Sequence, residues 1–443
     1  MGAGPTASVP PGRLGLPWLG ETLALLRNPF AFLDVRQRRY GPVFKSRILG
    51  RPTVFLGSAE GAEAFYDAGN IGRDDAHPYP IVDLFGGVNM EMYDGERHRA
   101  LKAITLTAFD RDALAAYLSD MERLVRGRLD QWSAGGELSA TAELRRLAIE
   151  VICRNLLGLE PGASTDTICR DYGLVLRGIV SVPLGIPGTP YGHARAARDR
   201  LLTTIRELVA ARRAAPTGDG LSRILTARAP DGRTCTDDEA VLEVHHVVMA
   251  GFIVYALMAE VLRRLAEDRA LAERCEDEVR RVAPADSPLS LRSLHELAVP
   301  MQVVDETKRM VPLVPLAFGR ARRAFSCGGY VVPEGWRVYL ALSLRNADPA
   351  VWSEPERFDP GRFGPERAEH ERHPLAFIPQ GAGPLTGHQC LGLEYSTVLT
   401  LVFLVLLVRD YEWDLPAQDL SYRWNTIPPE PRGGLRVRVR RRG

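Results

Sequence analysis

The stretch "PLAFIPQGAGPLTGHQCLGLEYSTVLTLVFLVLL" (374–407) decides the fold. It brings one cysteine, Cys390, to the start of a long apolar run, behind a loop that holds Gly381, Gly383, Gly387 and Gly392. We expect the run from Leu391 onward to be a helix, whose first backbone N–H groups favour a thiolate. Glycines let those groups approach the sulfur closely. One thiolate without partner thiols cannot build a zinc or iron–sulfur site. It could bind haem iron as a single axial ligand or act as a nucleophile, and a buried structural cysteine is the plain alternative.

The totals describe a soluble globular protein. The chain has 443 residues, of which 45% are hydrophobic and 25% charged, a composition that provides a large core. Length alone would allow about three domains, but no linker, repeat or low-complexity block divides the chain. We therefore expect a single domain over 1–443, monomeric, with a short flexible N-terminus at 1–9.

The net charge and the arrangement of cysteines indicate which binding partners and which cell compartment to expect. The net charge of +1 gives no reason to expect a nucleic acid or an anionic membrane as partner. Six scattered cysteines, with no CxxC pair and no secretory signal, favour a cytoplasmic protein. The longest apolar run, 398–408, is too short to cross a bilayer.

The pattern along the chain is mostly helical. Apolar residues at three- and four-residue steps predict helices over 95–109, 112–132 and 143–159, and a long, fully buried central helix over 237–268. A break rich in proline and glycine covers 181–192. Strands are predicted for a hairpin over 41–58, a strand–turn–strand over 328–346 and a closing hairpin over 428–440. The fold class is therefore mainly α with small β-sheets (α+β).

Four motifs, taken in order along the chain, resemble those of the cytochrome P450 haem-thiolate family. They are "GERHRALK" (95–102), "ETKR" (306–309), "FDPGRF" (358–363) and "HQCLG" (388–392), with Phe377 and glycines upstream of the last. The likeness runs from about residue 10 to residue 437. It implies the P450 fold, with haem b between the long central helix and the cysteine loop.

The resemblance also assigns roles to residues. Cys390 would be the axial ligand of the haem iron, in a loop that includes Phe377 and Gly392. The haem propionates would be bound by His98, Lys102, His388 and Arg320, with Arg322 as the alternative to Arg320. Glu306 and Arg309 lie three apart on one helix face, where they can bond and recruit Arg362 into a structural triad.

The cysteine loop departs from the usual pattern. Family members commonly place the phenylalanine seven residues before the cysteine, whereas Phe377 stands thirteen before Cys390. Thr386 occupies the position of the usual second glycine. The longer loop is similar to that of the peroxygenase branch, which uses peroxide.

The central helix departs more sharply. Family members carry an acid and an alcohol that relay protons to dioxygen; here "AGFIV" keeps Ala250 and Gly251 but has Ile253 and Val254 at those two places. Neither side chain can donate a proton. We expect Gly251 to leave room for a small ligand. His246, four before Ala250, should face the distal pocket as a substrate anchor or proton donor, unless it is a core histidine. We expect its neighbour His245 to point about a quarter turn away.

Three functions remain open at this point. The leading one is an oxidative tailoring step on a small apolar substrate, such as a secondary metabolite, with electrons from a ferredoxin and its reductase. The second is a haem-thiolate enzyme independent of dioxygen, driven by peroxide or acting on an N–O substrate by rearrangement, dehydration or nitrogen transfer. The third is a non-catalytic haem-binding sensor. We expect segments 75–92 and 179–186 to wall the pocket, together with Ala250, Ile253 and Val254.

Overall fold

The computed structural model describes residues 8–443. Residues 1–7 of the predicted flexible N-terminus lie outside the described residues. The remainder of that segment is attached to the fold, because the Ser8 carbonyl accepts a hydrogen bond from the Val331 N–H at 3.1 Å.

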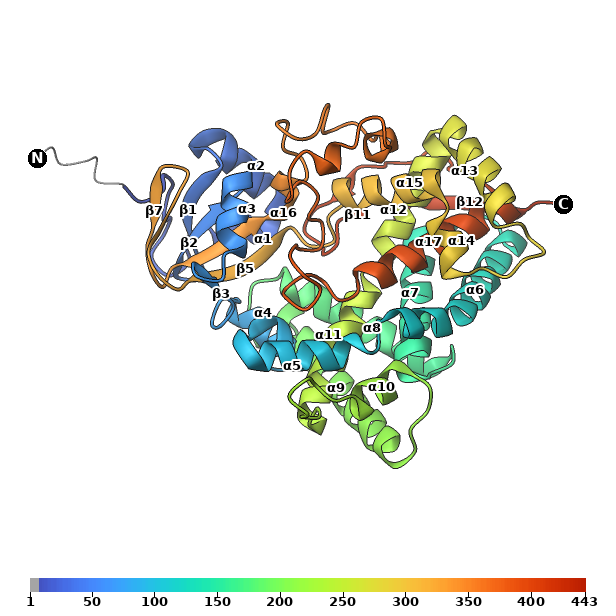
Figure 1. Cartoon of the computed structure of the whole chain (residues 1–443), viewed down its shortest axis with the longest axis horizontal. Coiled ribbons are helices and arrows are strands. Elements are labelled where there is room, and N and C mark those ends of the chain that lie inside the picture. Colours follow the sequence, from blue (N-terminus) through green and yellow to red (C-terminus); the bar gives the residue numbers. More distant parts are fainter. Residues whose placement is uncertain (1–7) are drawn as a thin grey trace, which may run out of the picture.

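Helices make up most of the described chain, as predicted (Figure 1). The α-helices are α1 (Thr22–Arg27), α2 (Pro29–Tyr40), α3 (Ala59–Tyr66), α4 (Tyr79–Leu84), α5 (Gly95–Leu106), α6 (Arg111–Ala134), α7 (Ala140–Leu157), α8 (Ala163–Ile179), α9 (Pro190–Ala214), α10 (Gly220–Thr226), α11 (Asp237–Phe252), α12 (Tyr255–Glu267), α13 (Arg269–Val282), α14 (Leu291–His295), α15 (Ala298–Met310), α16 (Leu342–Arg345) and α17 (Leu393–Asp410). Short 3₁₀ helices are η1 (Met90–Met92), η2 (Pro360–Phe363) and η3 (Glu369–Glu371).

The main sheet lies at the opposite end of the molecule from α6 and α13 (Figure 1). The main sheet has the order β1-β2-β8-β5-β3, built from β1 (Val43–Ile48), β2 (Arg51–Leu56), β8 (Arg337–Ala341), β5 (Leu316–Ala321) and β3 (Ile71–Gly72). β1 and β2 form the predicted antiparallel hairpin, in which Val43 pairs with Leu56. β2 and β8 run parallel, and the remaining pairs are antiparallel.

The strand–turn–strand over 328–346 is confirmed, but the closing hairpin is wrong, although strands form in that segment as well. β7 (Tyr330–Val332) pairs with β6 (Phe325–Cys327), while β8, after the same turn, enters the main sheet. At the C-terminus, β11 (Glu430–Pro431) pairs with β10 (Tyr422–Arg423). β12 (Arg436–Arg441) pairs instead with β9 (Tyr411–Asp414) and β4 (Leu138–Ser139). In both segments the turn separates two sheets, and the second strand pairs with a strand distant in the sequence.

The helix behind the cysteine loop is a core element. α17 begins at Leu393, two residues later than predicted, with Gly392 as its N-cap. Its residues from Tyr395 to Arg409 are buried, which explains why the run is apolar on all sides. The core of the helical part thus lies directly behind the loop that carries Cys390.

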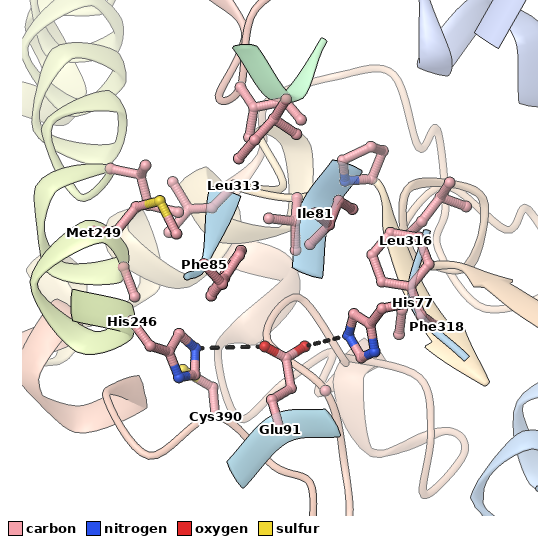
Figure 2. Close-up of a pocket in the computed structure, with 18 of the residues that line it drawn as sticks. His77, Ile81, Phe85, Glu91, His246, Met249, Leu313, Leu316, Phe318 and Cys390 are labelled. Carbon is pink, nitrogen blue, oxygen red and sulfur yellow. Dashed lines mark ion pairs between the residues drawn. The ribbon is translucent and has the colours of Figure 1, made fainter. Parts of the chain in front are cut away.

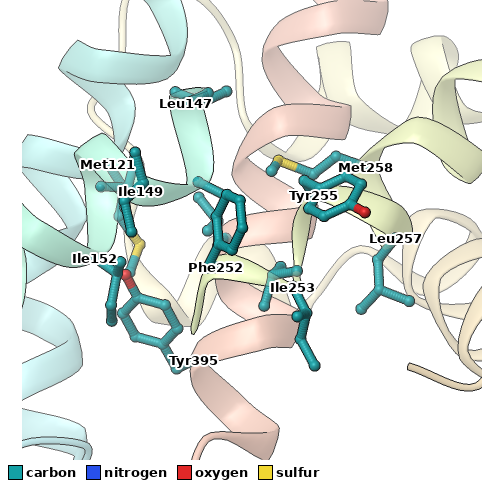
Figure 3. Close-up of a cluster of buried hydrophobic side chains, with 14 of the residues drawn as sticks. Met121, Leu147, Ile149, Ile152, Phe252, Ile253, Tyr255, Leu257, Met258 and Tyr395 are labelled. Atoms are coloured by element: carbon teal, nitrogen blue, oxygen red, sulfur yellow. The ribbon is translucent and has the colours of Figure 1, made fainter. Parts of the chain in front are cut away.

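The predicted central helix is interrupted. A capping box between Thr236 and Glu239 starts α11, but the helix ends at Phe252 and α12 begins at Tyr255. At the interruption the Val254 N–H donates to the carbonyl of Gly251, three residues back, and not to the residue four back as in an α-helix. Two consecutive β-branched residues after a glycine favour such a tight turn. Figure 3 shows Phe252 and Ile253 at this turn, packed among buried apolar side chains that include Ile152.

The same segment is the one stretch of the described residues that is long and apolar enough to span a membrane. Over Asp237–Glu267 the mean hydropathy reaches 1.8, but 83% of that window is buried inside the protein. Burial of this extent identifies a core segment of the fold.

Candidate active site

A largely apolar chamber lies between α11 and the cysteine loop (Figure 2). The two segments predicted to wall a pocket both line it: one contributes His77, Ile81 and Phe85, the other Ile179 and Pro183. The turn between β1 and β2 and the strand β5 form the wall of the chamber on the side of the main sheet. The chamber also has Cys390 in its wall, so it brings a thiol into contact with space for an apolar ligand.

The cysteine loop holds the thiol by its backbone. The Cys390 N–H donates to the carbonyl of Gln380 at 3.0 Å, and Gln380 Nε2 lies 3.8 Å from Cys390 Sγ. Burial raises the pKa of the Cys390 thiol, whereas the Gly392 N–H and Lys102 act in the opposite direction. The start of α17 thus favours the thiolate, as predicted, but the effect of burial on the pKa is the larger of the two.

Several buried nitrogen groups on the cysteine side lack a protein carboxylate. His98 donates from Nδ1 to the carbonyl of Met90 at 2.7 Å, while its Nε2 is buried without a partner. Its ring stacks on that of His388 at 3.9 Å between centroids. Lys102 is buried and donates to the carbonyl of Gln389 at 2.5 Å. The predicted propionate partners His98, Lys102 and His388 therefore all line the chamber.

Two arginines that the sequence did not single out belong to the same region. Arg73 and Arg337 are buried, and their guanidinium groups donate to the carbonyls of Phe318 and His77. Within residues 8–443 neither has an ion pair. Arg320 pairs with Arg337 across the sheet but is half exposed, and Arg322 is held by Asp94 at 2.8 Å. Between the two predicted alternatives, Arg320 is the one whose guanidinium is not closely paired.

These residues fit haem b. The single thiol suits one axial position of the iron, and the unpartnered buried cations suit two propionates. The apolar walls suit the porphyrin and a substrate.

Phe377 lies outside the chamber, contrary to the expectation. Its ring packs against Trp352 and Phe363, with centroid distances of 6.3 and 4.9 Å. The extra residues between Phe377 and Cys390 carry the phenylalanine away from the sulfur. Gly392, in contrast, lines the chamber beside Cys390.

The wall opposite the cysteine is formed by the broken helix. Ala250, Gly251, Ile253 and Val254 all line the chamber. The side chains of Ile253 and Val254 are buried and carry no polar atom, so this wall offers neither an acid nor an alcohol.

Gly251 serves a different purpose from the one expected. A Cβ at this position would meet Ile152 of α7 at 2.7 Å. The missing side chain therefore permits close packing of α11 on α7 and opens no space above a ligand.

Gly251→Ala is expected to destabilise the protein by about 1–3 kcal/mol, because the added methyl group overpacks a buried contact. Urea unfolding of the haem-loaded protein measures the loss. Ile152→Val, which removes the nearest methyl group, should recover part of it in the double variant. Equal stability of wild type and Gly251→Ala would contradict this packing role.

The two adjacent histidines of α11 have separate environments. His245 is buried away from the chamber, where Nε2 lies 3.0 Å from the carbonyl of Leu84 and Nδ1 lies 3.2 Å from the Tyr172 hydroxyl. Burial lowers its pKa to about 4. His246 lines the chamber, as predicted, and its ring lies 5.4 Å from that of Phe85.

His246 is held between two carboxylates. Its Nε2 lies 3.4 Å from Glu91 and its Nδ1 lies 3.9 Å from Glu243. Burial alone would lower the pKa of His246, but these carboxylates raise it to about 9. His77 meets the second oxygen of Glu91 at 3.5 Å, so Glu91 stands between two histidines (Figure 2).

The predicted triad forms behind the loop and is completely buried. Glu306 accepts two hydrogen bonds from Arg309, at 2.7 and 2.8 Å, and one from Arg362 at 3.0 Å. Arg362 also pairs with Glu369 at 2.9 Å, a fourth member that the sequence did not indicate. The network ties α15 to η2 and η3.

Sequence reasoning missed Glu91, His77 and Glu243 as well as the two buried arginines. Glu91 lies in a loop 155 residues before His246. Only the tertiary fold brings Glu91 and His77 beside His246, and no local pattern reports it. Glu243, in contrast, lies three residues before His246 on α11, a spacing that the sequence does display.

Comparison with known proteins gives a consistent result. The family model "Cytochrome P450" matches residues 10–426. Abscisic acid 8'-hydroxylase 4 of Arabidopsis thaliana is 28% identical and is aligned over 98% of this chain and 92% of its own length. The structure of retinoic acid bound cyanobacterial CYP120A1 superposes with a TM-score of 0.90, at 28% identity, over 99% of this chain and 100% of that one.

A second solved structure, cytochrome P450EX alpha (CYP152N1) with myristic acid, has a TM-score of 0.81 at 25% identity, covering 98% of this chain and 100% of its own. The match to the family model extends over nearly the whole chain, and the relatives include hydroxylases. These findings support an enzyme over a sensor. The chain belongs to the cytochrome P450 family of haem b-containing oxidoreductases.

Proposed function

We propose that this enzyme oxidises a small, largely apolar molecule and that Cys390 is the axial ligand of its haem iron. The observation that carries this proposal is the position of the thiol in the wall of an apolar chamber. Bound haem b supplies the iron chemistry that activates the oxidant and attacks the substrate. The chain supplies the ligand, the walls and the charges.

Each group of residues has a role in this proposal. His98, Lys102, His388, Arg73, Arg320 and Arg337 hold the two propionates. Glu306, Arg309 and Arg362 keep the segment beside the cysteine loop in place. Ala250, Ile253 and Val254 shape the space for the substrate opposite Cys390.

The relatives' names suggest a substrate class. They refer to abscisic acid, retinoic acid and myristic acid, which are apolar molecules with a carboxylate. A substrate carboxylate would not pair with His246 here, because both ring nitrogens already face Glu91 and Glu243. We therefore propose that the part of the substrate nearest His246 is apolar or a hydrogen-bond donor.

Dioxygen is the first candidate oxidant. Hydroxylation then follows RH + O₂ + 2e⁻ + 2H⁺ → ROH + H₂O, with the electrons from a ferredoxin and its reductase. We further propose that the enzyme works as a cytoplasmic monomer, folded as a single domain over 1–443.

A dioxygen-independent reaction is the second candidate, and the wall formed by Ile253 and Val254 favours it. Hydrogen peroxide gives RH + H₂O₂ → ROH + H₂O without an electron donor. A substrate with an N–O bond needs no added oxidant, because the bond itself carries the oxidising equivalents.

Three incubations separate these possibilities. Retinoic acid, abscisic acid, myristic acid and N-oxygenated analogues are first tested for a shift in the haem absorption spectrum. Those that bind are incubated with ferredoxin, reductase, NADPH and air; with hydrogen peroxide; and without oxidant under nitrogen. We expect product in the first incubation. Product only in the second or third would assign the enzyme to the dioxygen-independent group, and binding without product in all three would contradict the proposal.

A further inference from the structure

Glu91 is the only carboxylic acid among the described residues that line the chamber. About half of its side-chain surface (48%) is exposed, and this surface faces the chamber. Its two oxygens are engaged separately, one by His246 at 3.4 Å and the other by His77 at 3.5 Å. An acid placed between two imidazoles can take a proton from one and give it to the other.

His77 lines two cavities. One is the chamber, and the other is an outer vestibule whose lining includes Asp75, Tyr79 and Val88. All three of these vestibule residues are exposed. The ring of His77 is itself buried, and neither of its nitrogens makes a hydrogen bond within residues 8–443. It therefore stands in the partition between solvent and chamber, with Nε2 directed at Glu91 and Nδ1 without a partner among the described residues.

We propose that His77, Glu91 and His246 form a proton path from the vestibule to the chamber, in place of the acid and alcohol that Ile253 and Val254 replace. The proposal rests on the proposed function, since it assigns a proton supply to that same site. It makes Glu91, on η1, a catalytic residue, and it makes His246, on α11, a positioning residue that acts through Glu91.

The path performs a defined transfer. Glu91 donates a proton to the oxidant in the chamber, the His246 imidazolium beside it returns a proton to Glu91, and His77 restores the lost proton through Glu91 from vestibule water. Two such transfers balance the reduction of dioxygen with two electrons from ferredoxin. Contacts of 3.4 and 3.5 Å are longer than a hydrogen bond in which a proton moves, so a small rotation of the Glu91 side chain must shorten them.

Electrostatics agree with the geometry. His77 and His246 hold the pKa of the Glu91 carboxyl well below its usual value, against the effect of burial, and Glu91 and Glu243 keep His246 protonated. Arg73, Lys102 and Cys390 are further titratable groups close enough to interact electrostatically with Glu91. The proton is therefore stored on His246, beside Glu91.

The route predicts different results for the two oxidants. The peroxide reaction moves a proton from one oxygen of hydrogen peroxide to the other, which leaves as water. Glu91 and His246 suffice for this step. The dioxygen reaction takes both protons from outside the chamber and needs His77 as well.

The test uses the haem-loaded protein with Glu91→Gln and His77→Phe, and with Glu96→Gln and His193→Gln as matched controls on exposed positions. The first readout requires no turnover. Infrared spectroscopy of carbon monoxide bound to the reduced protein reports the charge and the donors that face the ligand. We expect the band to shift in Glu91→Gln and to stay in place in both controls.

The second readout is the epoxidation of styrene, a small apolar probe, under two conditions. With ferredoxin, reductase, NADPH and air, both variants should lose about tenfold or more of the epoxide yield per NADPH consumed. With hydrogen peroxide, Glu91→Gln should lose a similar factor, while His77→Phe should stay within about twofold of wild type.

Three results would overturn the path. They are an unmoved carbon monoxide band in Glu91→Gln, equal losses for His77→Phe under both conditions, and a wild type that forms epoxide with peroxide but none with ferredoxin, reductase, NADPH and air. A wild type that forms no epoxide under either condition would count against the proposed function. In that case the carbon monoxide band still decides whether the Glu91 cluster faces the ligand.

Discussion

Cys390→Ala is expected to abolish the thiolate-type absorption spectrum of the reduced, carbon monoxide-bound protein, and turnover is expected to fall by about a thousandfold or more. The reason is that no other thiol lines the chamber among the described residues, and the nitrogen ligands that do line it, such as His388, would give a different, non-thiolate spectrum. Around Cys390 the loop offers backbone amides and the side chain of Gln380, which are poor ligands for haem iron. Haem retained by the walls and the propionate partners would show the spectrum of a protein without a thiolate ligand.

Cys169→Ala is the matched control, because Cys169 is half-buried and lies outside the chamber. Its spectrum and haem content should equal those of wild type. A thiolate-type spectrum that persists in Cys390→Ala would remove the ligand assignment. Loss of the spectrum in both variants would show instead that the substitution disturbs the fold.

The sequence predicted those parts of the site that depend on residues close to one another in the chain. Glu306 and Arg309 on one helical turn, His98 and Lys102 four residues apart, and Cys390 before an apolar helix are all short-range patterns, and the structure places each group as expected at the chamber or behind it. The strand hairpin at β1 and β2 is local in the same sense.

What the sequence could not predict depends on distant partners. The interruption at Ile253 needs the backbone geometry of one turn, and the purpose of Gly251 needs the position of Ile152 on another helix. Phe377 was misplaced because a family spacing was carried over to a longer loop. β-strand pairing failed for a related reason, since a strand's partner is chosen by burial across the whole sheet.

Glu91, the acid in the chamber, illustrates this dependence on distant partners most directly. The pattern on α11 correctly brought His246 to the chamber, where we expected a substrate anchor or a proton donor. The structure surrounds it with Glu91 and Glu243, so its charge is already compensated. A function inferred from one helix face was thus altered by a loop that no periodicity connects to it.

Glu306→Gln is expected to have the largest effect on stability, about 3–5 kcal/mol in the free energy of unfolding. Glu306, Arg309 and Arg362 are each at most 2% exposed, and the carboxylate is the acceptor shared by both guanidinium groups. An amide of the same size removes the negative charge and leaves Arg309 as an uncompensated buried cation. Arg362 keeps Glu369 and several carbonyls, so Arg309 should account for most of the loss.

A matched control exists on the surface of the same region. Glu354 and Arg357 form a pair of the same i,i+3 spacing at 3.4 Å, with side chains 72% and 67% exposed. Glu354→Gln should change the stability by less than about 1 kcal/mol, because water and salt screen exposed charges. Urea unfolding of the haem-loaded variants, followed by both haem absorbance and far-UV circular dichroism, compares the two substitutions directly. A loss below about 1 kcal/mol in Glu306→Gln would mean that hydrogen bonds to carbonyls, rather than the buried charge, hold this network together.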